Sequence, residues 1–314
     1  MITIEDIEIA RERISPYIRR TPIMEALHAR DPLPVSASVV MKLELEQVTG
    51  SFKARGAMNR LLGTPADQIK AGIVTASGGN HGLAVARTAK VAGVPAVVFV
   101  PETVSPAKVE KMRAWGADVR IVGAEWSGSN EAAHDYARSS GASYFHPFAD
   151  PLVVAGQGTL GLEILDQTWD FDTIVVAIGG GGLVAGLSTA IKARRPDVRV
   201  VAVEPIGSPT IKASLDAGHV VSLPEVTSRV ATMSCRRTDE RIFEIARQNI
   251  EHVVLVSDEA MLEASQWLWF EFGIAADLSG AASIAALRSG DPIFEGSRRI
   301  CAIVCGAGAE GAAP

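Results

Sequence analysis

Short runs of aliphatic and β-branched residues alternate with helical patterns along most of the chain. An opening helix is predicted at 4–19, where isoleucines recur near helical spacing, and an apolar strand at 39–44. Further strands are predicted at 72–76, 96–100, 118–122, 143–145, 173–178, 198–204, 252–256 and 300–305. The helices between them are predicted at 54–62, 83–92, 105–115, 130–139, 158–167, 183–193, 208–217, 239–249, 258–272 and 279–288. This alternation predicts an α/β fold with mainly parallel strands and helices on both faces.

The stretch 146–151 is rich in proline and separates two such α/β runs. A chain of 314 residues is long enough for two domains. We therefore expect residues 146–151 to be a crossing between domains.

Composition and charge narrow the class of protein. Apolar residues make up 47% and charged residues 21% of the chain, as in ordinary globular proteins. A net charge of −6 without a basic run argues against a nucleic-acid partner. No apolar run approaches the roughly 20 residues that span a bilayer, and the acidic N-terminus is unlike a secretory signal. Three cysteines without a CxxC pair favour a reducing, cytoplasmic location.

Lys53 is the first candidate for chemistry. It follows Gly50, Ser51 and Phe52 and precedes Gly56, so bulky groups could approach its amine. Burial beside apolar side chains would lower its pKa and favour the neutral, nucleophilic amine. Taken alone, however, a lysine here is better explained as a solvated charge at a helix start.

Two glycine-rich turns lie between a predicted strand and a predicted helix. Four consecutive glycines at 179–182 would let a phosphate approach the main chain at a helix N-terminus. The same residues also match a dinucleotide fingerprint through Gly180, Gly182 and Ala185, with Glu204 placed to bind a ribose. A nicotinamide dehydrogenase or other nucleotide-binding protein is thus an alternative, but it gives neither Lys53 nor the second turn a role.

The second turn, at 77–82, offers main-chain N–H groups and the Asn80 amide, which suit a carboxylate or a phenolic oxygen. His81 is either a general base or a neutral structural residue, since a helix N-terminus disfavours its protonated form. Cys235 and Cys301 are expected to be small buried hydrophobes. Cys305 differs because it ends a predicted strand, where parallel-sheet proteins bind ligands.

Together these motifs resemble the fold-type II pyridoxal-phosphate enzymes, particularly the threonine/serine dehydratase and serine racemase group. The resemblance covers about residues 5–308. Its carriers are Thr-Gly-Ser-Phe-Lys-Ala-Arg-Gly-Ala at 49–57, Ser-Gly-Gly-Asn-His-Gly at 77–82, Ala-Gly-Gln-Gly-Thr at 155–159, Gly-Gly-Gly-Gly-Leu at 179–183 and Ile-Val-Cys-Gly-Ala-Gly at 303–308.

The resemblance implies a tryptophan synthase β-like fold of two open, twisted, mainly parallel sheets. Residues 49–145 would form a small domain, and residues 1–48 and 146–314 a large one that binds the cofactor. It also implies a homodimer that acts on a small-molecule amino acid.

The resemblance further assigns roles to individual residues. Lys53 would bind pyridoxal 5'-phosphate covalently and be the catalytic base. The cofactor phosphate would lie against the glycine turn, the ring and its 3′-oxygen against Phe52 and Asn80, and the ring nitrogen against Cys305. The glycine-turn residues are Gly179, Gly180, Gly181, Gly182 and Leu183, and the residues for the substrate carboxylate are Ser77, Gly78, Gly79, Asn80 and His81.

The implied reaction is an α,β-elimination from a β-hydroxy amino acid, by default L-threonine or L-serine, to a 2-oxo acid and ammonia. A thiol at Cys305 is a weak donor and leaves the ring unprotonated, which favours prompt loss of a β-leaving group. Racemases of this group carry a serine at the position of Gly78, where this chain has no acid or base. An amino acid racemase is therefore the less favoured activity.

Other departures from the family pattern leave the substrate open. The family's Ala-Asp-Gly segment is replaced by Val-Ala-Thr at 230–232, and Glu-Pro by Asp277 and Leu278. Pro209 and Thr210 stand where a carboxylate would complete a cation site, so no metal is expected. Arg236 and Arg237 are either solvated charges or ligands for a second anionic group on the substrate. The alternative substrates are 3-hydroxyaspartate and a hydroxylated diamino acid of the ectoine-utilisation type. An alternative function is that of a non-catalytic amino-acid sensor.

Overall fold

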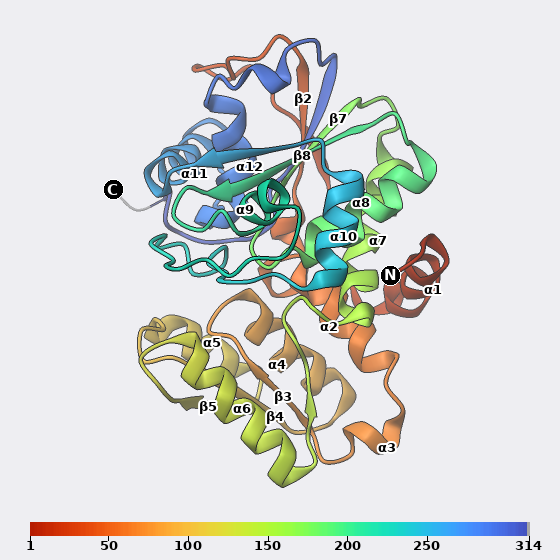
Figure 1. The fold of residues 1–314 in the computed structure, drawn as a ribbon, viewed down its shortest axis with the longest axis vertical. Helices are drawn as coiled ribbons and strands as arrows, with labels where there is room; N and C mark the ends of the chain where they lie inside the picture. Colours follow the sequence, from red (N-terminus) through yellow and green to blue (C-terminus); the bar gives the residue numbers. More distant parts are fainter. Residues whose placement is uncertain (313–314) are drawn as a thin grey trace.

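Six strands form the larger of two sheets in the computed structural model, which describes residues 1–312 (Figure 1). The strand order is β1-β2-β10-β7-β8-β9, and every neighbouring pair is parallel except β1 with β2. Its inner strands are buried along nearly their whole length, as expected where helices cover both faces. The strands are β1 (Ile23–Glu25), β2 (Ser38–Lys42), β7 (Thr173–Ala177), β8 (Arg199–Pro205), β9 (His252–Val256) and β10 (Arg299–Ile303).

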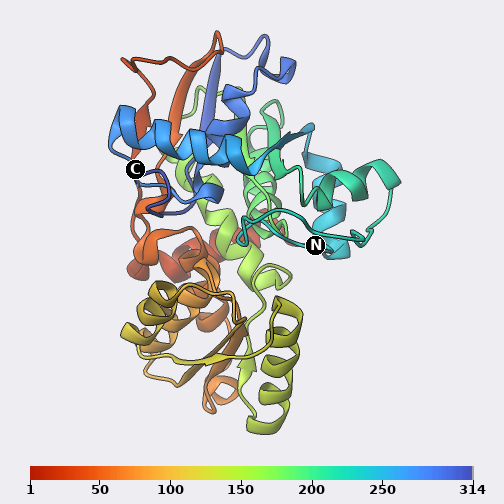
Figure 2. The same cartoon turned by 90° about the vertical axis from the view of Figure 1, so that its left-hand side faces the viewer.

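Helices cover this sheet, and the apolar side chains of most of them join one continuous core with the strands, whereas those of the first helix join smaller clusters. In Figure 1 the sheet and its helices form the upper lobe of the molecule, and Figure 2 shows them from the side. The helices are α1 (Ile4–Ile14), α7 (Pro151–Gln167), α8 (Gly182–Arg194), α9 (Thr210–Ala217), α10 (Glu240–Asn249), α11 (Asp258–Phe272) and α12 (Leu278–Arg288). Short 3₁₀ helices lie at Ser15–Tyr17, Glu44–Glu46, Val48–Gly50 and Pro292–Phe294.

The second sheet has four parallel strands in the order β5-β4-β3-β6 and lies in the lower lobe. Alternate residues of β4 face opposite sides: Val98 and Val100 pack with α4 and α5, whereas Val97 and Phe99 pack with α6. The elements are β3 (Ile73–Ala76), β4 (Ala96–Val100), β5 (Asp118–Ile121), β6 (Ser143–Tyr144), α2 (Lys53–Leu62), α3 (Ala66–Ile69), α4 (Asn80–Ala92), α5 (Pro106–Ala114) and α6 (Trp126–Ser140).

The predicted α/β architecture is confirmed, but several element boundaries were wrong. The opening helix ends at Ile14 rather than residue 19, since a 3₁₀ helix that contains Pro16 begins at Ser15. α6 begins at Trp126 and α7 at Pro151, four and seven residues earlier than predicted. β1 and α3 were not predicted at all. Among the described residues, no helix is both long and apolar enough to cross a membrane.

Candidate active site

Lys53 is the first residue of α2, and its amine points toward the segment that connects β6 to α7. Its Nζ donates a hydrogen bond to the main-chain oxygen of Pro147 at 2.8 Å and lies 5.1 Å from the centre of the Phe52 ring. Burial of the ammonium group lowers the pKa of Lys53 to about 8, and the nearby thiols of Cys305 and Cys235 only partly oppose this. The side chain is therefore buried rather than solvated, and a much larger fraction of it is the neutral, nucleophilic amine near neutral pH than for an exposed lysine.

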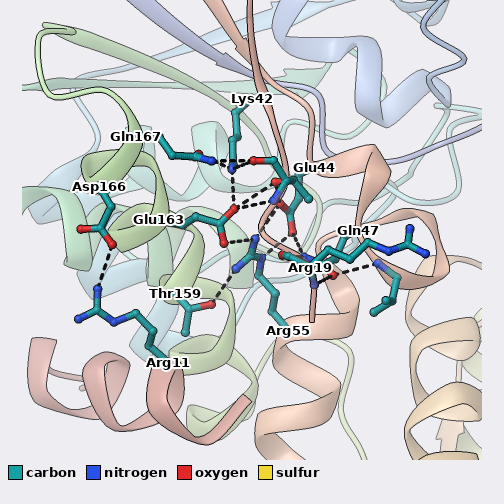
Figure 3. A network of polar contacts seen from close by, with 12 residues as sticks. Arg11, Arg19, Lys42, Glu44, Gln47, Arg55, Thr159, Glu163, Asp166 and Gln167 are labelled. Carbon is teal, nitrogen blue, oxygen red and sulfur yellow. Dashed lines mark hydrogen bonds and ion pairs between the residues drawn. The ribbon is translucent and has the colours of Figure 1, made fainter. Parts of the chain in front are cut away.

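A buried cluster of four charges fixes α2 just beyond Lys53 (Figure 3). Arg55 binds Glu44 through Nε at 2.5 Å and Nη2 at 2.9 Å, and the same Nη2 lies 2.9 Å from Glu163. Lys42 donates to Glu163 at 2.6 Å, to the Thr21 oxygen at 2.7 Å and to Gln167 at 2.6 Å. Two cations and two carboxylates thus neutralise one another and join α2 to β2 and α7.

Glycines let α2 and α7 approach closely. A Cβ at Gly56 would lie 2.7 Å from the Val153 oxygen, and one at Gly156 would lie 2.7 Å from the Arg55 oxygen. The family motif at 155–159 therefore serves helix packing here and holds the helix that begins with Lys53.

The glycine turn at 179–182 connects β7 to α8 as predicted. Gly181 has a φ of +92°, and α8 has no side-chain cap, so its first N–H groups remain available to an anion. Close packing also requires these glycines: a Cβ would lie 2.2 Å from the Phe148 ring at Gly180 and 2.5 Å from Ile242 at Gly181. The run of glycines thus reflects both an open helix start and crowded neighbours.

The turn at 77–82 is also an uncapped helix start, because α4 begins at Asn80 and Gly79 offers no side-chain cap. The Asn80 Nδ2 donates to Asp277 Oδ2 at 2.9 Å, and the Gly79 N–H donates to the Ser77 hydroxyl at 3.4 Å. Asn80 also lies beside Gly306, because a Cβ built on Gly306 would be 3.0 Å from the Asn80 Nδ2. The contact joins this turn to the residue after Cys305.

His81 is neutral. Its Nε2 lies 3.2 Å from the Phe145 oxygen, so Nε2 carries the proton, and its buried Nδ1 has no partner within residues 1–312. Burial, with the charge of Lys53 nearby, lowers the pKa of His81 to about 3. Of the two interpretations left open by the sequence, the structural one fits, since such a group does not hold a proton at neutral pH.

Cys305 follows β10 and is buried next to the start of α2. The Phe52 N–H donates to the Cys305 oxygen at 3.3 Å, and the Cys305 thiol donates to the Ser279 oxygen at 3.4 Å. Burial and the Asp277 carboxylate raise the pKa of the thiol, so it stays protonated. Cys301 is buried as expected, whereas Cys235 is only partly buried.

Sequence reasoning missed several residues of this site. Asp277 caps α12 through the Gly280 N–H at 2.6 Å and orients Asn80, and an Asp three residues before Gly280 is a recognisable N-cap signal. Pro147 contacts Lys53, and Phe148 contacts Gly180. No local sequence pattern predicts either contact.

Gly78 faces Val104 of the loop before α5. A Cβ at Gly78 would lie 2.8 Å from Val104 Cγ2, closer than carbon atoms approach one another. The space that a side chain would need at residue 78 is therefore filled by an aliphatic group.

The dinucleotide alternative is wrong. The Glu204 carboxylate accepts hydrogen bonds from the Ile211 N–H at 2.8 Å and the Lys212 N–H at 2.9 Å, at the start of α9. It is fully buried and its pKa is raised to about 7, so it is not a ligand for a ribose at the cofactor turn.

The guanidinium groups of Arg236 and Arg237 are already engaged. Arg236 donates to the oxygens of Leu223 at 3.0 Å and Pro224 at 2.9 Å. Arg237 is paired with Glu240 at 2.8 Å. They hold the 220–224 segment and the start of α10.

The residues fit pyridoxal phosphate: a desolvated amine, an uncapped glycine-flanked helix start for a phosphate, and a polar turn with a neutral thiol around them. The family model for pyridoxal-phosphate-dependent enzymes matches residues 14–306, and the chain belongs to this family. Its cofactor is pyridoxal phosphate.

Relatives of the chain include amino-acid lyases and racemases. The chain is 37% identical over 281 residues to L-threonine ammonia-lyase of Geobacter sulfurreducens, covering 90% of this chain and 69% of that protein. The structure of a threonine deaminase from T.th. superposes with a TM-score of 0.89 at 35% identity, covering 97% and 98% of the two chains. Maize serine racemase superposes with a TM-score of 0.92 at 31% identity, covering 98% and 93%.

Proposed function

We propose that this protein is a pyridoxal-phosphate-dependent dehydratase that converts a β-hydroxy amino acid, L-threonine or L-serine, to a 2-oxo acid and ammonia. The observation that carries the proposal is the contact of Gly78 with Val104, set beside the desolvated amine of Lys53. Lys53 is the base on one face, and an aliphatic wall lies where racemases of the family carry a serine.

The residues of the site divide the work of an elimination. When bound, pyridoxal phosphate accepts the electrons released at the substrate Cα. The N–H groups of the turn at 77–81 bind the substrate carboxylate, and Asn80, oriented by Asp277, fixes the ring. Lys53 Nζ removes the Cα proton, and this proton can pass to the β-hydroxyl, which leaves as water. Hydrolysis of the released enamine, which consumes one water, then gives the 2-oxo acid and ammonia. When the Lys53 amine is free, it donates a hydrogen bond to the main-chain oxygen of Pro147.

Racemisation needs a second acid or base opposite Lys53. Gly78 has no side chain, and His81, with a pKa of about 3, neither donates nor keeps a proton near pH 7. The likeness to maize serine racemase is a likeness of fold, and the site chemistry favours elimination.

The same geometry favours an uncharged substrate side chain. 3-Hydroxyaspartate would bring a second carboxylate, but Arg236 and Arg237 are already bound to main-chain oxygens and Glu240. We therefore place threonine and serine ahead of 3-hydroxyaspartate and the hydroxylated diamino acids.

We also propose that residues 49–145 form a small domain and the rest a large one. The chain passes between the two sheets near residue 50 and again near residues 145–150, and Lys53 and Pro147 lie at these two crossings.

A substrate panel tests the proposal. Ammonia and 2-oxo acid should be released from L-threonine or L-serine by the wild type with cofactor bound. Lys53→Ala should abolish turnover and the visible cofactor absorbance, whereas Lys192→Ala, at a partly exposed position of α8, should retain both. Turnover by Lys53→Ala, or no ammonia from any hydroxy amino acid, would refute the assignment.

A further inference from the structure

The segment 230–235 lies against both glycine turns of the site. A Cβ built on Gly79 would be 3.2 Å from Thr232 Cγ2. A Cβ built on Gly179 would be 2.8 Å from the Thr232 oxygen and 3.2 Å from Met233 Cα. One residue, Thr232, therefore contacts the turn after β3 through its methyl group and the turn after β7 through its main chain.

Hydrogen bonds hold the main chain of the segment on both sides of Thr232. Before it, Val230 donates through its N–H to the Ser228 hydroxyl at 3.1 Å, and the Ser234 hydroxyl donates back to the Val230 oxygen at 3.0 Å. After it, the Cys235 N–H donates to the Ser208 hydroxyl at 3.0 Å. Met233 is 1% exposed and joins the core of the large sheet. Thr232 is thus presented by a fixed loop.

The Thr232 side chain itself is half-buried and has no hydrogen-bond partner in the part of the chain that the structure describes. Its methyl group lies beside Gly79, in the turn that binds the substrate carboxylate in the proposed function.

We propose that Thr232 sets the size of the substrate side chain that the site accepts. With the carboxylate at the 77–81 turn and the phosphate at the 179–182 turn, the wall joining these two subsites is Thr232. Among the described residues, its methyl group is the one atom outside the neighbouring residues within 4 Å of a Cβ built on Gly79, so it limits the bulk accepted at the substrate Cβ. This rests on the proposed function and names the residue that selects among its substrates.

Two substitutions separate bulk from polarity. Thr232→Ser removes the methyl and keeps the hydroxyl, whereas Thr232→Val keeps the bulk and removes the hydroxyl. One methyl in an apolar wall changes selectivity by roughly tenfold or more. We expect Thr232→Ser to raise kcat/KM for L-threonine relative to L-serine by about tenfold, and Thr232→Val to keep the wild-type ratio. Thr168→Ser, at the exposed end of α7, is the matched control and should also keep it.

A binding measurement gives a second readout that does not depend on turnover. Spectroscopic titration of the holoenzyme with L-alanine and L-valine, which lack a β-leaving group, yields two dissociation constants. Thr232→Ser should tighten valine binding relative to alanine by about tenfold, and the control should not.

The outcomes distinguish this inference from the proposed function. If the wild type releases ammonia but Thr232→Ser keeps the wild-type ratio of kcat/KM for threonine over serine, the role of Thr232 is overturned and the proposed function stands. The same follows if Thr232→Val shifts this ratio as much as Thr232→Ser does. If the wild type releases no ammonia, the proposed function fails, and the valine/alanine binding ratio still decides whether Thr232 limits side-chain size.

Discussion

Replacing Arg55 by leucine should destabilise the protein by more than any surface ion pair is worth. Arg55 is 1% exposed and is bound by Glu44, which is fully buried, and by Glu163. Without the guanidinium, the Glu44 carboxylate loses its cation inside the protein, a change that costs about 3–5 kcal/mol. The same substitution at Arg247, half exposed and paired with Glu244 on α10, should cost about 0–1 kcal/mol.

Urea unfolding followed by tryptophan fluorescence measures both losses. The double variant Arg55→Leu with Glu44→Gln removes the unpaired charge, so it should be more stable than Arg55→Leu alone. Two results would show that the four charges do not act as one buried cluster. One is a free energy of unfolding of Arg55→Leu within about 1 kcal/mol of the wild type. The other is a loss of stability in the double variant that equals the sum of the losses in the two single variants. Because α2 begins with Lys53, the single variant should also bind pyridoxal phosphate less tightly.

Three further predictions concern pH and packing. In the apoenzyme, attachment of pyridoxal phosphate to Lys53, trapped with borohydride and measured by peptide mass, should increase with pH and reach half its maximum near pH 8 rather than 10.5, since only the neutral amine reacts. Gly78→Ser should lower the free energy of unfolding by about 1–3 kcal/mol through its clash with Val104, and Val104→Ala in the same chain should restore most of it in thermal melts. Burial raises the pKa of Glu204 from 4.5 to about 7, so between these pH values the folded protein retains a proton that the unfolded chain releases. Stability should therefore fall as pH rises through this window. Glu204→Gln should flatten the dependence of Tm on pH.

The alternation of strands and helices was predictable because both sheets are mainly parallel and their central strands are buried. Strands such as β4 and β7 read as continuous apolar runs, and a helix follows each of them. The start of α7 was not predicted, although Asp150 caps it and Pro151 occupies its first turn. Gly156, in the part of α7 that was missed, and Gly158, where the predicted helix began, disfavour a helix on their own, and the close approach of α2 and α8 explains why both are glycine.

The residues of the candidate site also fall into those that the sequence predicted and those that it did not. Lys53, the two glycine turns and Cys305 follow strands or begin helices, so local pattern located them. Asp277 contacts Asn80 across 197 residues of sequence, and Phe148 packs on Gly180 from another element. Such contacts depend on how the two sheets pack, and a single sequence carries no signal for them.

The most direct test of the central claim is the fate of L-serine and L-threonine in one reaction vessel with the holoenzyme. Ammonia, 2-oxo acid and the D-isomers are quantified together over time. With Lys53 as base and Gly78 against Val104, ammonia and 2-oxo acid should form in equal amounts and no D-isomer should accumulate. Accumulation of D-serine without matching ammonia would contradict the account.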